Sequence, residues 1–147
     1  LQELDKNMAQ YTSSGSKPCK MARAGEYAIG ASLSFVAMKS LEMGYPVSMV
    51  IPADCAGYEL QASGLVKTSA NKSDAQRFLD WTLSDEAAQI YAKYKAIVTI
   101  PGTKLSESAV NAGLPEDLST VLYPVDFAKS AAERSTILKT WKEKINR

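Results

Sequence analysis

The hydrophobic pattern of the first 67 residues alternates between helical spacing and short apolar runs. Apolar positions three and four residues apart predict amphipathic helices, and this spacing recurs in segments 2–9, 18–24 and 34–43. Apolar or alternating runs predict strands, and they occupy segments 27–33, 46–52 and 58–67. Because helices that alternate with strands favour parallel pairing, we expect an α/β fold in which helices flank a parallel or mixed sheet.

From residue 68 onward the pattern is mostly helical. Ser73 and Gln76 form a capping box that predicts the start of one helix, and Ser84 predicts the N-cap of a second helix through Tyr94. The remaining predicted elements are a short strand at 96–100, a weak helix at 106–112, a loop at 114–126 and a last helix at 127–145. The C-terminal portion is therefore predicted to be helical.

The stretch 50–64 lies where the pattern changes. It leaves an apolar run, passes through a tight loop at 54–57 and re-enters an extended segment at Tyr58 and Glu59. Such a joint is a hinge, a binding edge or a crossover between two parts of a fold.

Composition and charge exclude several classes of function. The chain has 147 residues with 46% hydrophobic and 22% charged positions, which is typical of one folded domain, and its net charge of +1 does not favour nucleic acid as a partner. The sequence has no histidine, which excludes Ser-His-Asp catalysis, Cys-His catalysis and His-ligated zinc within this chain. No motif implies a cofactor, so we expect a binding protein and not an enzyme.

Two cysteines, Cys19 and Cys55, belong to no CxxC pair. They are either two reduced, small apolar residues or a disulfide, and a disulfide would indicate an oxidising compartment. The chain begins at Leu1 with no signal peptide, and we expect it to be a fragment of a longer protein.

The strongest chemical signal is the segment 12–18, which is rich in serine and precedes a predicted helix. Hydroxyls, as in Ser14 and Ser16, and backbone N–H groups, as near Gly15, suit an anion such as a phosphate, phosphonate, sulfate or carboxylate. The alternative is a plain serine-capped turn.

Two further pairs of polar residues lie at the ends of predicted strands. Ser32 and Ser34 close the strand that contains Gly30, where ligands of open α/β sheets bind, although small-residue packing would explain them equally well. Tyr58 and Glu59 would hold an ammonium group, sugar hydroxyls or a metal, or else are ordinary surface residues.

Four motifs in the same order resemble the C-terminal half of extracellular solute-binding proteins of bacterial ABC importers. They are YTSSGSKP at 11–18, AGEYAIG at 24–30, GYE at 57–59 and FLDWTLSDEA at 78–87. The group that the chain resembles most binds ferric iron, 2-aminoethylphosphonate or hexose phosphates.

The resemblance implies a type 2 periplasmic-binding-protein fold with two lobes around a ligand cleft. Residues 1–57 would then be a portion of the second lobe, 58–67 the crossover, and 68–147 a helical portion that packs on a first lobe largely absent from this chain. The segment 14–16 matches the anion-contacting loop of the family, and Glu59 matches a ligand-contacting acid. Phe35 and Val36 occupy the place of a family His-Asp pair, and consecutive iron-binding tyrosines are absent, which weakens hexose phosphate and iron.

The resemblance also implies a periplasmic protein that captures a small anionic solute and passes it to an inner-membrane ABC permease. The alternatives are a ferric-iron-binding transport protein and the effector-sensing domain of a transcription regulator. Since sheet edges and apolar helix faces would be exposed in a fragment, we expect self-association, exchange of elements between copies, or a compact core with disordered ends.

Overall fold

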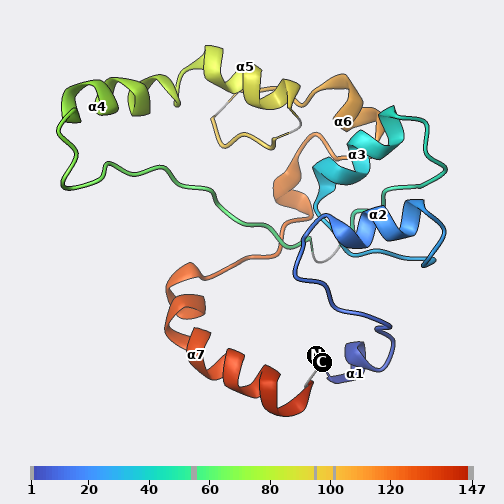
Figure 1. The fold of residues 1–147 in the computed structure, drawn as a ribbon. Coiled ribbons are helices and arrows are strands. Elements are labelled where there is room, and N and C mark those ends of the chain that lie inside the picture. The colour runs from blue at the N-terminus through green and yellow to red at the C-terminus, as the bar shows by residue number, and fades with distance from the viewer. Residues whose placement is uncertain (1, 54–55, 95, 101, 146–147) are drawn as a thin grey trace.

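A computed structural model describes residues 2–53, 56–94, 96–100 and 102–145, and its regular structure is helical (Figure 1). The elements are α1 (Gln2–Asp5), α2 (Lys17–Arg23), α3 (Ser34–Glu42), α4 (Lys72–Trp81), α5 (Asp85–Lys93), α6 (Glu107–Asn111), the 3-10 helix η1 (Leu118–Thr120) and α7 (Phe127–Lys144). No helix of these residues is long and apolar enough to cross a membrane.

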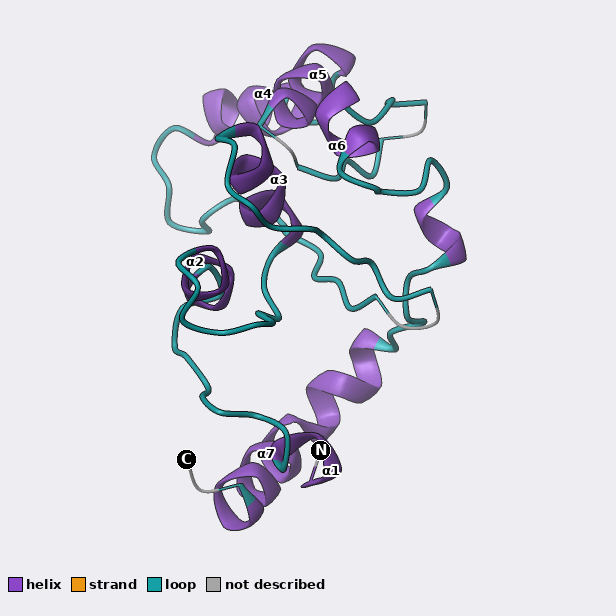
Figure 2. Cartoon of the chain, turned by 90° about the vertical axis from the view of Figure 1, so that its right-hand side faces the viewer, coloured by secondary structure: helices purple, strands orange, loops and turns teal. Residues whose placement is uncertain are grey.

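The predicted α/β fold with a parallel or mixed sheet is wrong. Within the described residues the chain forms no β-strand, and its only ladder contact is an isolated parallel bridge between Ala56 and Leu122. The segments expected to be strands, 27–33, 46–52, 58–67 and 96–100, run as loops (Figure 2). A strand requires a second extended segment about 4.8 Å away along its length, and among the described residues no ladder joins any of these four segments to another.

Segments 27–33 and 46–52 contact helices where a sheet was expected. The neighbour of segment 27–33 is the start of α2, because a Cβ atom at Gly30 would collide with the carbonyl group of Pro18. Segment 46–52 instead contributes Met49 and Ile51 to a cluster with α3 and α6. Segment 46–52 therefore packs apolar side chains against helices, whereas segment 27–33 packs the backbone of Gly30 on α2 and leaves Ile29 exposed, and neither contact requires strand pairing.

Most helix ends agree with the sequence. Gly25 and Gly44 follow α2 and α3 with φ of 78° and 77°, a left-handed conformation that glycine adopts without strain. Ser84 accepts a hydrogen bond from Ala87 N at 3.2 Å and caps α5 as expected. The predicted capping box is wrong, because α4 begins at Lys72, one residue before Ser73.

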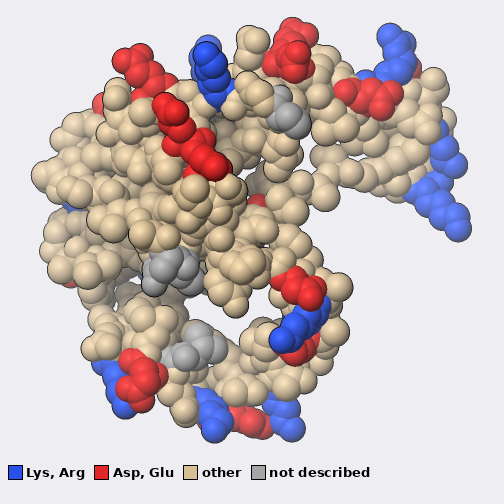
Figure 3. Space-filling model, turned by 180° about the vertical axis from the view of Figure 1, so that it is seen from behind, with Lys and Arg blue, Asp and Glu red and all other residues tan. Residues whose placement is uncertain are grey.

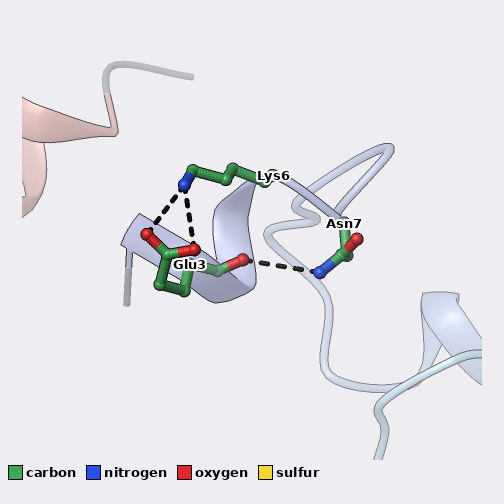
Figure 4. A network of polar contacts seen from close by, with 3 residues as sticks. All are labelled: Glu3, Lys6 and Asn7. Carbon is green, nitrogen blue, oxygen red and sulfur yellow. Dashed lines mark hydrogen bonds and ion pairs between the residues drawn. The ribbon is translucent and has the colours of Figure 1, made fainter.

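The first predicted helix is shorter than expected. It covers Gln2–Asp5 only, and the N–H groups of Asn7 and Met8 then bond to carbonyls three residues earlier, which tightens the turn and ends it. Lys6 Nζ lies 2.7 and 2.9 Å from the carboxylate oxygens of Glu3 (Figure 4). Both side chains are largely exposed, so the pair contributes little to stability.

The small core joins α2, α3 and α6. Met38 of α3 packs with Ala109 and Leu114, and Cys19 of α2 lies 3.8 Å from the fully buried Ser40 hydroxyl of α3. Arg23 Nη1 donates to the same hydroxyl at 3.3 Å. These contacts fix α2 against α3, and α2 follows the serine-rich segment.

The last helix, α7, lies with α1 on one side of the molecule, apart from α4 and α5 (Figure 1). The rings of Tyr11 and Trp141 meet edge to face at 4.9 Å, and Ile145 at the C-cap is buried. Leu138 is exposed, and no residue within α7 itself is buried. The helix is therefore covered at its C-terminal end and open along its middle.

Candidate functional site

The segment 12–18, called the serine loop below, has a fixed local geometry. Thr12 Oγ1 donates to Ser14 O at 2.7 Å, and Lys17 N donates to the same carbonyl at 3.2 Å. The hydroxyls of Ser14 and Ser16 lie 3.2 Å apart. Ser14 and Gly15 are exposed, and Ser16 is the N-cap of α2 but makes no side-chain cap bond.

The structure brings the second serine segment to this loop. Ser32 Oγ donates to Gly15 O at 2.5 Å, across 17 residues of sequence. Gly30 packs directly on the backbone of Pro18, where an added Cβ atom would collide with the carbonyl group. Ser34 begins α3 next to Leu33, whose side chain would meet a Cβ atom placed on Gly15.

The chemistry of this arrangement is donation of hydrogen bonds. The Ser14–Ser16 pair shares one hydroxyl proton between two oxygens, which leaves the second proton for a ligand or for water. Ser32 uses its own proton on Gly15, so it acts on the loop backbone and is not a free donor. Lys17 is exposed at the first position of α2 and supplies a positive charge.

The other predicted residues, Tyr58 and Glu59, lie in a different setting. The ring of Tyr58 meets that of Phe127 edge to face at 5.8 Å, at the start of α7. Ala56 pairs with the backbone around Leu122, through Ala56 N to Val121 O at 2.8 Å. Glu59 is exposed, and among the described residues no hydrogen bond or ring contact joins this pair to the serine loop.

Cys19 is buried. Its proposed partner Cys55 lies outside the described residues, so the disulfide stays a prediction.

One interaction near the loop was not foreseen from the sequence. The Arg23 guanidinium lies 4.4 Å from the centre of the Tyr45 ring while it donates to Ser40. No local signal links these three residues, since they are separated by 5 to 22 positions along the chain. Arg23 is therefore committed to packing and is not the cation of an anion site.

Other surface features do not point to a second site. One shallow hollow lies along α7, and another lies between α5 and the segment 102–106. In the parts of the chain that the structure describes, no group of three or more Cys, Asp or Glu residues converges to hold a metal ion. Ser119 lowers the pKa of Asp117 below its ordinary value, by donation first from its hydroxyl and then from its N–H, and these bonds cap η1.

Comparison with known proteins identifies what the chain is similar to. Residues 1–131 match a family described as bacterial extracellular solute-binding protein. An uncharacterized protein of Haemophilus influenzae is 28% identical over 145 residues, which cover 99% of this chain and 42% of that protein. The chain thus spans less than half the length of this curated relative. No solved structure gives a significant match.

Proposed function

Because the chain belongs to the bacterial extracellular solute-binding protein family, we propose that it forms part of a protein that captures a small anionic solute for an ABC importer. Proteins of this family bind solutes outside the cytoplasm for transport, and the family is generally non-enzymatic. The periplasm is the compartment in which such a protein would meet both its solute and an inner-membrane permease. A phosphonate or a phosphate ester is the solute class that we favour.

One observation carries the choice of an anion. The hydrogen bond from Ser32 to Gly15 draws two serine-bearing segments together at one exposed loop. Hydroxyl donors and the Lys17 ammonium are groups that pair with the oxygens of a phosphoryl or phosphonyl group. No acidic residue occurs in the serine loop, so an anion would meet no like charge from the loop itself.

The role of Glu59 depends on a rearrangement. Segment 58–67 is an extended connection with mostly exposed residues, which supports its assignment as the crossover between a portion of one lobe at 1–57 and a helical portion at 68–147. In the closed protein this connection would turn Glu59 toward the serine loop, where its carboxylate would orient an amine of the solute. Tyr58 would form part of the same wall.

The alternatives receive less support. A ferric ion favours several oxygen donors at one point, and among residues 2–53, 56–94, 96–100 and 102–145 no group of three or more Cys, Asp or Glu residues converges to supply carboxylate ligands. An effector domain of a transcription regulator would act inside the cell, whereas the matching family is extracellular.

Isothermal titration of the 147-residue chain with inorganic phosphate and with 2-aminoethylphosphonate tests the proposal. A hydrogen bond to a charged group is worth about 1.5–3 kcal/mol, so Ser14→Ala should weaken binding about 10- to 150-fold. Ser48→Ala, at an exposed position of segment 46–52, is the matched control and should leave the affinity unchanged. Equal affinities of the two variants for every bound anion would refute the site.

A further inference from the structure

Segment 27–33 runs along the serine loop and contacts it at three points. Ser32 Oγ donates to Gly15 O at 2.5 Å, and the side chain of Leu33 would lie 3.2 Å from a Cβ atom placed on Gly15. Gly30 packs on the carbonyl group of Pro18. Two consecutive residues of segment 27–33 therefore hold Gly15 from outside the loop.

The carbonyl oxygens of Ser14 and Gly15 are held in different ways. Ser14 O accepts from Thr12 Oγ1 at 2.7 Å and from Lys17 N at 3.2 Å, which are donors of the loop itself. Gly15 O accepts from Ser32, which lies 17 residues away, and no other hydrogen bond to Gly15 O occurs among the described residues. The orientation of the Gly15 carbonyl therefore depends on Ser32.

The peptide bond between Gly15 and Ser16 carries this contact to the next residue. A trans peptide group is planar, and its C=O and N–H point in opposite directions. A hydrogen bond that turns Gly15 O toward Ser32 therefore also turns Ser16 N–H away from Ser32. In the part of the chain that the structure describes, this N–H donates to no acceptor.

The direction of this peptide dipole matters because the loop itself carries little charge. Lys17 is the single charged residue of the serine loop. On the face seen from behind, few charged side chains lie over α2, whereas they gather over the ends of the molecule (left in Figure 3). If the Gly15–Ser16 peptide turned over, its carbonyl oxygen would replace the N–H and would repel an anion.

We propose that Ser32 is a positioning residue of the anion site. Its hydrogen bond holds the Gly15–Ser16 peptide with the carbonyl oxygen turned away from the anion and the N–H turned toward it. This inference rests on the proposed function, because it assigns how the serine loop receives the anion. Ser14 and Ser32 then have different roles: Ser14 offers a hydroxyl to the solute, and Ser32 acts through Gly15 without touching the solute.

The amide resonance of Ser16 in the ligand-free chain tests the hydrogen bond by NMR. This N–H belongs to the same peptide group as Gly15 O, so its nitrogen and proton shifts respond to the bond that Ser32 donates. Ser32→Ala should move the resonance, and Ser32→Thr, which keeps the hydroxyl, should restore it. Ser48→Ala, at an exposed position of segment 46–52, is the matched control and should leave it unchanged. An unchanged Ser16 resonance in Ser32→Ala overturns the proposal, because a serine that only contacts solute has no effect before solute is added.

Isothermal titration with inorganic phosphate tests the consequence for binding. Ser32→Ala should weaken the affinity about 2- to 10-fold, the effect of one neutral hydrogen bond, and Ser32→Thr should bind as the unsubstituted chain does. Equal affinities of Ser32→Ala and Ser48→Ala overturn the proposal even if the Ser16 resonance moves.

The two proposals fail in different ways. An unsubstituted chain that binds neither phosphate nor 2-aminoethylphosphonate refutes the proposed function and this inference with it. Loss of affinity in Ser14→Ala without any loss in Ser32→Ala refutes this inference alone.

Discussion

The close approach between segment 27–33 and the serine loop makes Gly30 a sensitive position. A Cβ atom there would collide with the carbonyl carbon and oxygen of Pro18 and lie 3.1 Å from Cys19 N. These atoms are backbone atoms at the start of α2, so they cannot move aside as the end of a flexible side chain can. The substitution Gly30→Ala must therefore push segment 27–33 away from α2.

The cost follows from overpacking. Inserting a methyl group into a tight contact costs about 1–3 kcal/mol, while replacement of glycine by alanine gains about 0.4–1 kcal/mol by restricting the unfolded chain. We expect Gly30→Ala to destabilise the contact by a net amount near the lower part of the first range. Gly64→Ala is the matched control, because no atom lies within 4 Å of its added Cβ and it keeps only the gain.

The thiol of Cys19 reports directly on this contact. It lies in α2 and is only 6% exposed, so a thiol reagent must wait for local opening. In a Cys55→Ser background, where Cys19 is the remaining thiol, a net cost of about 1 kcal/mol means that Gly30→Ala should raise the labelling rate about 5-fold. The rate of the Gly64→Ala variant should equal or fall below that of the background protein.

Equal labelling rates for Gly30→Ala and Gly64→Ala would refute the packing of segment 27–33 on α2. The same experiment on the unsubstituted chain counts thiols: two reactive thiols after denaturation would exclude the predicted bridge between Cys19 and Cys55.

Three further predictions follow from single contacts. Ser40→Ala should lower the free energy of unfolding in urea by about 1–3 kcal/mol, because the buried hydroxyl that accepts from Arg23 is lost. Asp126→Ala should remove the N-cap of α7 and cost about 1 kcal/mol of helix stability, seen as reduced ellipticity at 222 nm. The carboxyl of Asp117 should titrate by NMR with a pKa below 3.8, and Ser119→Ala should raise that pKa toward 3.8. Since the folded pKa is the lower one, the stabilising contribution of Asp117 is complete above pH 3.8 and is lost as pH falls through the folded pKa.

Local features of the fold were predictable because their causes are local. Gly25 and Gly44 end helices through their own φ angles, and Ser84 caps α5 through atoms three residues away. The wrong N-cap at Ser73 is also a local error of two residues. Asn71 and Ser73 are both polar residues near the start of α4, and the sequence pattern does not show which of them is the N-cap.

The sheet was predicted wrongly from hydrophobic alternation, because alternation indicates only that one face of a segment packs against other parts of the protein. It does not indicate whether the element packed against that face is a strand or a helix. Met49 and Ile51 pack on the cluster between α3 and α6, and the backbone of Gly30 packs on the start of α2. Strand pairing depends on segments distant in sequence, and that information is absent from the pattern of any one of them.

The two parts of the candidate site, Ser32 and Glu59, also differ in how well the sequence predicts their positions. Ser32 was singled out because it follows a predicted strand, and in the structure its hydroxyl donates to the carbonyl of Gly15. Glu59 was placed by its position after a loop, but its distance from the serine loop depends on the path of an extended connection. The hydrogen bond from Ser32 to Gly15 fixes the position of Ser32 relative to the serine loop. Glu59 is exposed on the connection 58–67, so its position relative to the serine loop depends on the parts of the protein that contact this connection. Binding should therefore depend on Ser14 in this chain alone, and on Glu59 only in a protein that fixes segment 58–67.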